Sequence, residues 1–209
     1  MARCSLFLLL IFLSATAKAE KPWKDSPHGP MLERIIPPGF TAAMLPEPRS
    51  QGAKLALRYC VQCHNLANPA MHDAGRWPAV VRRMVPRMEG KGNMGKLMAE
   101  MMAGVEAPTP EEEQAIVAYH RRHALQPLDA KRIPEVNAPG AESFRIACGQ
   151  CHALPDPRMH TAKDWPAVVA RMQKNMEWMN RVVGSTPIPG EPQLRIEDIN
   201  AFLIRHAKR

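Results

Sequence analysis

The sequence lacks any apolar run long enough to cross a bilayer as a helix. Its longest run, Leu6 to Leu13, has eight residues, whereas a membrane-spanning helix needs about 20. The run follows the basic Arg3 and precedes a stretch of small residues at 14–19, an order typical of a secretory signal peptide. We therefore expect residues 1–19 to be removed and the mature chain to be a soluble, secreted protein.

Cysteine is also scarce, with five residues in the chain, and Cys4 lies within the expected signal peptide. The other four form two close pairs, which are Cys60 with Cys63 and Cys148 with Cys151. Four cysteines in an oxidising compartment would usually form two disulfides. Disulfides alone leave unexplained why a histidine directly follows each pair.

A convincing β-strand pattern is missing, and the expected fold class is all-α. In the first half we expect helices from about residue 52 into the first cysteine pair, from about Trp77, and from Thr109-Pro110-Glu111, where acidic residues occupy the first turn. In the second half we expect helices from about residue 140, from about Trp165, and over about 194–207. Asp73 and the Thr161/Asp164 pair are candidate caps of the middle helices.

A strong excess of charge is absent as well. The formal net charge is +8, and loss of Arg3 and Lys18 with the signal peptide lowers it to +6. The basic residues are dispersed and the protein is expected to be secreted, so we expect no DNA or RNA partner. Net charge steers encounters, and Arg205, Lys208 and Arg209 crowd the end of the last expected helix. An acidic docking surface on a protein partner is therefore expected.

What the sequence does contain is an internal repeat. At an offset of 88 residues the two halves share the cysteine pairs and the segments Gly-Ala, Met-His, Trp-Pro-Ala-Val-Val and Arg-Met, which begin in the first half at residues 52, 71, 77 and 83. Near the end of each half the offset becomes 83, and there Tyr119 matches Phe202. The second half has therefore lost five residues before its last helix, and a duplication is the simplest explanation.

This repeat predicts the domain organisation. The signal peptide (1–19) is followed by a proline-rich N-terminal arm (20–48), which we expect to be extended, although it could also wrap a domain or contact a partner. Two small domains of about three helices each cover 49–126 and 140–209. A linker with three prolines joins them at 127–139.

Each cysteine pair belongs to a Cys-x-x-Cys-His motif, the attachment sequence of c-type haem. The residues are Cys60, Cys63 and His64, and Cys148, Cys151 and His152. Two thiols three positions apart can reach the two vinyl groups of one porphyrin, and the adjacent histidine then binds the iron as the proximal ligand. A structural zinc site would not require these histidines, and a thioredoxin-like pair would be expected near a βαβ pattern.

The sixth iron ligand is left open between several methionines. Met172, Met176 and Met179 share one helical face, and Met84 and Met88 begin the same stripe in the first half. Such a stripe is typical of core packing, but one methionine per half is also a candidate ligand. Repeat equivalence favours Met88 and Met176. A ligand in the loop beyond the helix would instead be Met94 and Met179, with Met98 a weaker candidate.

Histidines are rival ligands, because both halves have one at an equivalent place, His72 and His160. Each lies eight residues after the proximal histidine, which leaves little chain to reach the opposite face of a porphyrin. A propionate or backbone hydrogen bond is therefore favoured for them. Trp77 and Trp165 are expected either to reach a propionate or to anchor their helices in the ordinary way. His123 and His206 are expected to be exposed near helix ends.

These motifs and the terminal helix of each half resemble the dihaem members of the class I cytochrome c superfamily, with the two-domain plan of cytochrome c4. The resemblance covers about 53–209. It implies one covalent haem per domain and single-electron transfer between periplasmic or membrane-bound redox proteins, without enzymatic activity. The alternatives are a haem enzyme, such as a dihaem peroxidase or a sulfur-compound oxidoreductase, and a cytochrome subunit of a larger dehydrogenase or oxidase.

Overall fold

The computed structural model describes residues 22–186 and 194–209, and the expected signal peptide lies outside them. Within these residues there are eight α-helices and no strand, which confirms the all-α fold class. The helices are α1 (Gly29–Leu32), α2 (Gln51–Tyr59), α3 (Trp77–Met88), α4 (Lys96–Met101), α5 (Pro110–Arg122), α6 (Glu142–Cys148), α7 (Trp165–Val183) and α8 (Ile196–Arg205). None of them is long and apolar enough to cross a membrane.

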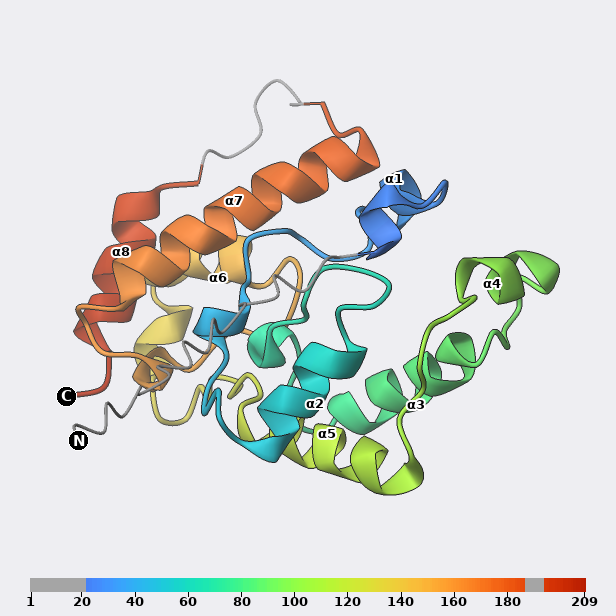
Figure 1. The fold of residues 1–209 in the computed structure, drawn as a ribbon. Coiled ribbons are helices and arrows are strands. Elements are labelled where there is room, and N and C mark those ends of the chain that lie inside the picture. Colours follow the sequence, from blue (N-terminus) through green and yellow to red (C-terminus); the bar gives the residue numbers. More distant parts are fainter. Residues whose placement is uncertain (1–21, 187–193) are drawn as a thin grey trace, which may run out of the picture.

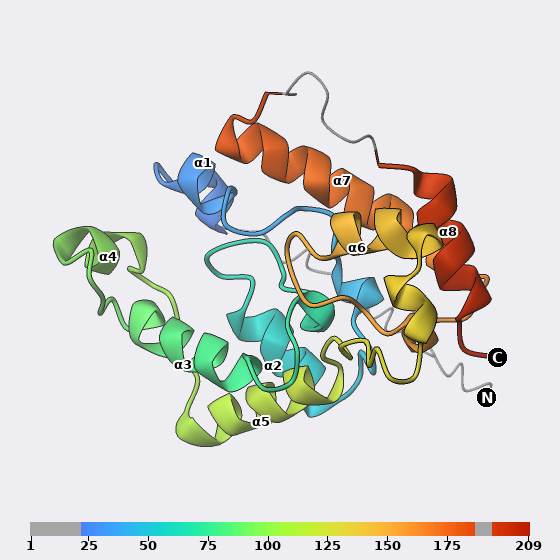
Figure 2. The same ribbon diagram turned by 180° about the vertical axis from the view of Figure 1, so that it is seen from behind.

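The helices form two groups with the same plan (Figures 1 and 2). In one group α5 packs against both α2 and α3, and in the other α8 packs against both α6 and α7. Separate hydrophobic clusters fill the two groups: Trp77, Val81 and Ile116 lie in the first, and their repeat equivalents Trp165, Val169 and Ile199 lie in the second.

The crossing of the first and last helices differs between the halves. In the first half Gly52 lies against Tyr119, so closely that a Cβ added at residue 52 would be 2.3 Å from the Tyr119 Cβ. In the second half the rings of Phe144 and Phe202 stack with centroids 4.8 Å apart, and Gly140 has nothing within 4 Å of its added Cβ. Different side chains therefore pack at the helix crossing in the two halves.

The middle helix of each half is anchored by its tryptophan. The indole N–H of Trp77 donates to the Pro69 carbonyl oxygen at 2.8 Å, and that of Trp165 donates to Pro157 at 2.7 Å. Both rings are buried, and the prolines that follow them occupy the first helical turn, where no backbone N–H is needed. Of the two roles expected for these residues, the structure shows the ordinary helix anchor.

The expectation of three helices in each half holds for the second half and is wrong for the first. Helix α3 has 12 residues and ends at Met88, two positions before Gly90, which has a left-handed conformation (φ 71°). Helix α7 is longer, with 19 residues in total. Glycine adopts this conformation without a steric penalty, so the chain turns and forms the additional helix α4. Trp178 occupies the position equivalent to Gly90. Helix α7 therefore continues to Val183, and its C-cap is Gly184 (φ 70°).

The caps agree with the sequence in part. Thr109 and Glu112 form a complete capping box at the start of α5, as its sequence indicates. The cap expected at Asp73 is wrong, because its carboxylate accepts hydrogen bonds from the backbone of Gly75 and Arg76, just before α3 begins. Thr161 donates to the Asp164 carboxylate, but no side chain caps the backbone of α7.

The proline-rich arm is not extended; it folds against the first half. Leu45 is buried in a cluster with Ala53, Ala56 and Tyr119. The Tyr119 hydroxyl donates to the Pro46 carbonyl oxygen at 2.7 Å. The segment 127–139 is likewise packed, because Ile133 and Val136 lie in the core of the second half.

Buried His120 on α5 is a feature that the sequence analysis did not identify. Its side chain is 1 % exposed, its Nδ1 lies 2.9 Å from the Ile116 carbonyl oxygen, and its ring is 4.2 Å from that of Trp77. Burial is the largest cause that lowers the pKa of His120. The equivalent residue in the second half is Leu203, which is also 1 % exposed.

We expect His120→Leu to make the first half less sensitive to acid. A lowered pKa means that the unfolded state binds the proton more readily, so the wild type loses free energy of unfolding as the pH falls below about 6.5, by at most about 1.4 kcal/mol per pH unit from this group. Urea unfolding at pH 5.5 and pH 7.5 measures the loss in both proteins. Equal losses in wild type and variant would contradict the prediction.

Candidate cofactor site

The first attachment motif begins where α2 ends. Cys60 is the C-cap residue, and its backbone N–H donates to the Ala56 carbonyl oxygen at 2.9 Å. His64 is half-buried, and its Nδ1 lies 2.7 Å from the Asn65 carbonyl oxygen. A proton on Nδ1 is therefore held by the backbone, and Nε2 is left with its lone pair for a metal.

The second motif repeats this arrangement. Cys148 is the last residue of α6, and the His152 Nδ1 lies 2.8 Å from the Ala153 carbonyl oxygen. Both histidines thus have the tautomer-fixing backbone contact that is usual for a metal-binding imidazole. The two motifs therefore have the same local histidine geometry.

The four cysteines of the motifs are free thiols. Burial raises the pKa of Cys60 and of Cys148 to about 12, and that of Cys63 to about 11. Cys151 is the exposed member of the set. At neutral pH the buried thiols stay protonated, and they are poor nucleophiles in this state.

Alkylation of the folded apoprotein is therefore expected to be selective. With iodoacetamide at pH 8, Cys151 should react first, because a pKa of about 12 for Cys60 and Cys148, instead of 9.0, leaves about a thousandfold less thiolate. Peptide mass spectrometry measures the order of modification. In urea all four cysteines should react at similar rates, and selectivity that persists there would contradict a role for burial.

Two segments cover the first attachment loop. From the arm, the Trp23 indole N–H donates to the Val61 carbonyl oxygen at 3.0 Å, and the Ile36 carbonyl accepts from the Asn65 side chain at 3.0 Å. From the chain before α5, the backbone N–H and carbonyl of Glu106 both pair with the side-chain amide of Gln62, at 2.8 and 2.9 Å. The loop is consequently fixed from two sides.

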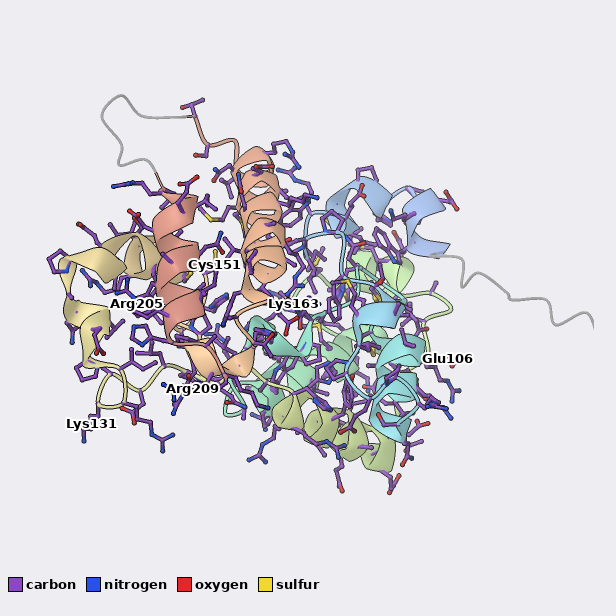
Figure 3. All side chains as sticks on the ribbon, turned by 90° about the vertical axis from the view of Figure 1, so that its left-hand side faces the viewer. Glu106, Lys131, Cys151, Lys163, Arg205 and Arg209 are labelled. Carbon is purple, nitrogen blue, oxygen red and sulfur yellow. The ribbon has the colours of Figure 1, made fainter. Side chains whose placement is uncertain are left out.

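The second attachment loop has no equivalent cover among the described residues. Gly149, Gln150, Cys151 and Ala153 are all exposed, whereas the equivalent residues of the first half are half-buried or buried. Figure 3 shows Cys151 on the second half, in the view that also presents Arg205 and Arg209. The two sites therefore differ in access to solvent even though their sequences match.

The candidate methionines lie in unequal environments. Met88 and Met176 are half-buried, and Met88 packs against the first core. Met94 and Met179 are exposed at 37 % and 38 %. The expectation that Met179 lies in a loop is wrong, because α7 extends beyond it to Val183.

Met102 was missed by the sequence analysis. It is buried, and its Sδ lies 3.4 Å from the Cys63 Sγ, which is the direct contact between a methionine and an attachment cysteine. The weaker candidate, Met98, is buried as well. The repeat gave no reason to single out Met102, because the second half has Ser185 and Gly190 at the two equivalent positions.

The remaining candidate histidines have defined surroundings. His72 and His160 lie edge-on to Trp77 and Trp165, and their backbone carbonyls accept from Leu125 and Lys208 at 3.0 Å. Burial is the largest cause that lowers the pKa of both. His123 and His206 are half-buried against Tyr119 and Phe202, so the expectation that they are exposed is wrong.

Arg171, on α7, offers an observation on the fit of a carboxylate-bearing cofactor. Its Nε is buried and has no hydrogen-bond partner among the described residues, and burial lowers its pKa. A buried guanidinium N–H without a partner is costly, and a carboxylate such as a propionate group would satisfy it. Together with the free thiols and the oriented histidines, this donor set fits haem.

Within residues 22–186 and 194–209, no three His, Cys, Asp or Glu side chains converge as they would around a metal ion. Comparison with protein families, curated proteins and solved structures found no match. Function is therefore inferred from the residues of the two motifs and their surroundings.

Proposed function

We propose that this chain is a dihaem c-type cytochrome that transfers single electrons between redox proteins in the periplasm. The observation that carries the proposal is the duplicated Cys-x-x-Cys-His motif, in which each histidine is held through Nδ1 and keeps Nε2 for iron. Haem supplies an iron that changes between the ferrous and ferric states.

Different residues of each half would attach the porphyrin and bind its iron. Cys60 and Cys63, or Cys148 and Cys151, would hold the porphyrin covalently, and His64 or His152 would bind its iron through Nε2. The half-buried Met88 on α3 and Met176 on α7 are the candidates for the second protein ligand of each iron, and buried Met102 is a further candidate in the first half. An apolar lining of this kind excludes water and keeps the ligands in place in both oxidation states.

The alternatives are an enzyme and a subunit of a larger complex. Catalysis at a haem requires a coordination position that is open or can open, with polar groups beside it, whereas the stripe of α7 is made of methionine and valine. The proline-rich arm, which could have contacted a larger complex, packs on the first half instead. Electron transfer remains the function that these residues support best.

The mass of the intact protein tests the proposal. After maturation in a competent host and acid–acetone extraction, the polypeptide should retain two haems. The ferric protein should show the weak near-infrared band of thioether–iron bonding, and addition of peroxide should cause no turnover above that of free haem. Zero or one haem on fully matured protein would refute the proposal.

Matched variants separate the two sites. Cys60→Ala with Cys63→Ala should remove one haem, and Cys148→Ala with Cys151→Ala should remove the other. Single replacements of Met88, Met102 and Met176 by alanine should show, by loss of one haem's share of the near-infrared band, which residue binds iron. Absence of the band from the unsubstituted protein, with a bis-histidine magnetic resonance signature, would transfer the assignment to histidine.

A further inference from the structure

The ends of α5 and α8 occupy equivalent places in the repeat but differ in their partners. At the end of α5, the guanidinium of Arg122 and the Nε2 of His123 each lie 3.7 Å from one Glu47 carboxylate oxygen. This distance is within ion-pair range and beyond a hydrogen bond. The arm thus places a carboxylate on the cationic end of the last helix of the first half.

The backbone conformation of Glu47 is unusual. Its φ is +44°, the one positive value for a residue other than glycine among the described residues. Such a conformation is unfavourable for a residue with a Cβ and persists where the surroundings enforce it. Here the neighbouring contacts are the buried Leu45 and the Pro46 carbonyl oxygen, which accepts from Tyr119.

At the end of α8 the corresponding residues are Arg205 and His206. Arg205 makes no ion pair within the described part of the chain, and the buried Nε2 of His206 has no hydrogen-bond partner there. Phe202 replaces Tyr119, so the hydroxyl that binds the arm in the first half is also missing. The second half has the cationic pair but no carboxylate equivalent to Glu47.

The surface around this pair is a hollow of about 390 Å³. Its cationic lining consists of Arg132, Arg158, Arg205, Lys208 and Arg209. Two of these are paired, Arg132 with Asp129 at 3.5 Å and Arg158 with Asp156. Arg205, Lys208 and Arg209 make no ion pair within the described residues, so the hollow retains a positive balance, and Figure 3 shows Arg205 and Arg209 in one view of the second half.

We infer that this hollow is the docking site for an acidic segment of a redox partner protein, whose carboxylate takes the place beside Arg205 and His206 that Glu47 takes beside Arg122 and His123. The identity of the partner as a redox protein rests on the proposed function, whereas the binding site itself does not. The exposed second attachment loop belongs to the same half as the hollow.

A synthetic peptide of eight glutamates is the probe, and an eight-glutamine peptide is its uncharged control. Isothermal titration calorimetry of the full mature protein at low ionic strength should give one site for the glutamate peptide and none for the glutamine peptide. Affinity should fall as salt is added, because exposed charges are screened. Intact mass on the same sample reports the haem count separately, so a failure of the proposed function is distinguishable from a failure of docking.

Charge reversal locates the site. Arg205→Glu should weaken binding about tenfold, because it replaces an attractive pair by a repulsive one. Arg82→Glu, an exposed position of α3 in the first half, makes the same change in net charge and should leave the affinity within about twofold. Equal losses in the two variants would show that net charge alone attracts the peptide and would overturn the assignment.

Glu47→Gln tests the equivalence of the two helix ends. It removes the carboxylate from Arg122 and His123, and a second, weaker site for the glutamate peptide should then appear. Stoichiometry that stays at one would show that the ends are not equivalent and would overturn the inference. Binding to phosphatidylglycerol vesicles that depends on Arg205, without binding of the peptide, would assign the hollow to a membrane surface instead.

Discussion

Gly52→Ala is expected to destabilise the first half by about 3 kcal/mol. The new Cβ would lie 2.3 Å from the Cβ and 2.7 Å from the Cγ of Tyr119, and both atoms are close to the backbone of α5. Tyr119 is fully buried and its hydroxyl is bound to Pro46, so the side chain has no space into which to move. Relief requires that α2 and α5 separate, which opens the core between them.

Gly140→Ala is the matched control, because the repeat places it at the equivalent position and nothing lies within 4 Å of its added Cβ. It should leave stability unchanged or raise it by about 0.5 kcal/mol through loss of entropy in the unfolded chain. Urea unfolding followed by circular dichroism measures both variants. Similar midpoints would mean that the close crossing of α2 and α5 is not important for stability.

If the proposed function holds, removal of the haem at the second motif is expected to slow electron exchange with a protein-sized partner at least about tenfold, whereas removal of the haem at the first motif should leave the rate nearly unchanged. The reason is the difference in solvent access. Hydrogen bonds of Trp23, Asn65 and Gln62 hold other segments of the chain against the first attachment loop, whereas the second loop is exposed from Gly149 to Cys151. A tenfold difference corresponds to about 1.4 kcal/mol in the activation free energy.

Stopped-flow oxidation by an acidic cupredoxin is the measurement, with Cys148→Ala/Cys151→Ala and Cys60→Ala/Cys63→Ala as the pair of variants. Each variant must show a native circular dichroism spectrum and one haem by mass, because misfolding of one half would also lower the rate of electron exchange. Equal rates would mean that the cover on the first loop does not limit access. Faster exchange through the first haem would reverse the assignment of the accessible site.

Much of the helical scaffold was predictable from local sequence. The helices at Trp77, Thr109 and Trp165 begin where a proline in the first turn indicates, and the capping box of Thr109 adds a second signal for α5. Helix α4 was not predicted, since its existence depends on a left-handed turn at Gly90 that the second half replaces with Trp178. A repeat alignment favours the shared features and therefore hides such a difference.

The candidate site was predictable in its attachment residues and less so in its surroundings. Cys-x-x-Cys-His is a local pattern, and the structure orients both histidines in the same way. Contacts such as Met102 with Cys63 and Trp23 with Val61 join residues that are 39 and 38 positions apart, and no local pattern indicates them. Long-range packing decided which neighbours each motif received.

The sequence by itself determined the two Cys-x-x-Cys-His motifs, the duplication and the helical character of each half, because these depend on spacing within a few residues or on direct comparison of the two copies. Only the tertiary structure decided that the copies are unequal. The arm supplies Trp23, Leu45 and Glu47 to the first half, whereas the second half receives from it the hydrogen bond from Arg34 to the Val182 carbonyl oxygen, away from the attachment loop. The physical reason is that burial and charge pairing depend on which surfaces come into contact in the folded chain. Glu47 and Arg122 are far apart in the sequence, and no local pattern indicates that they meet.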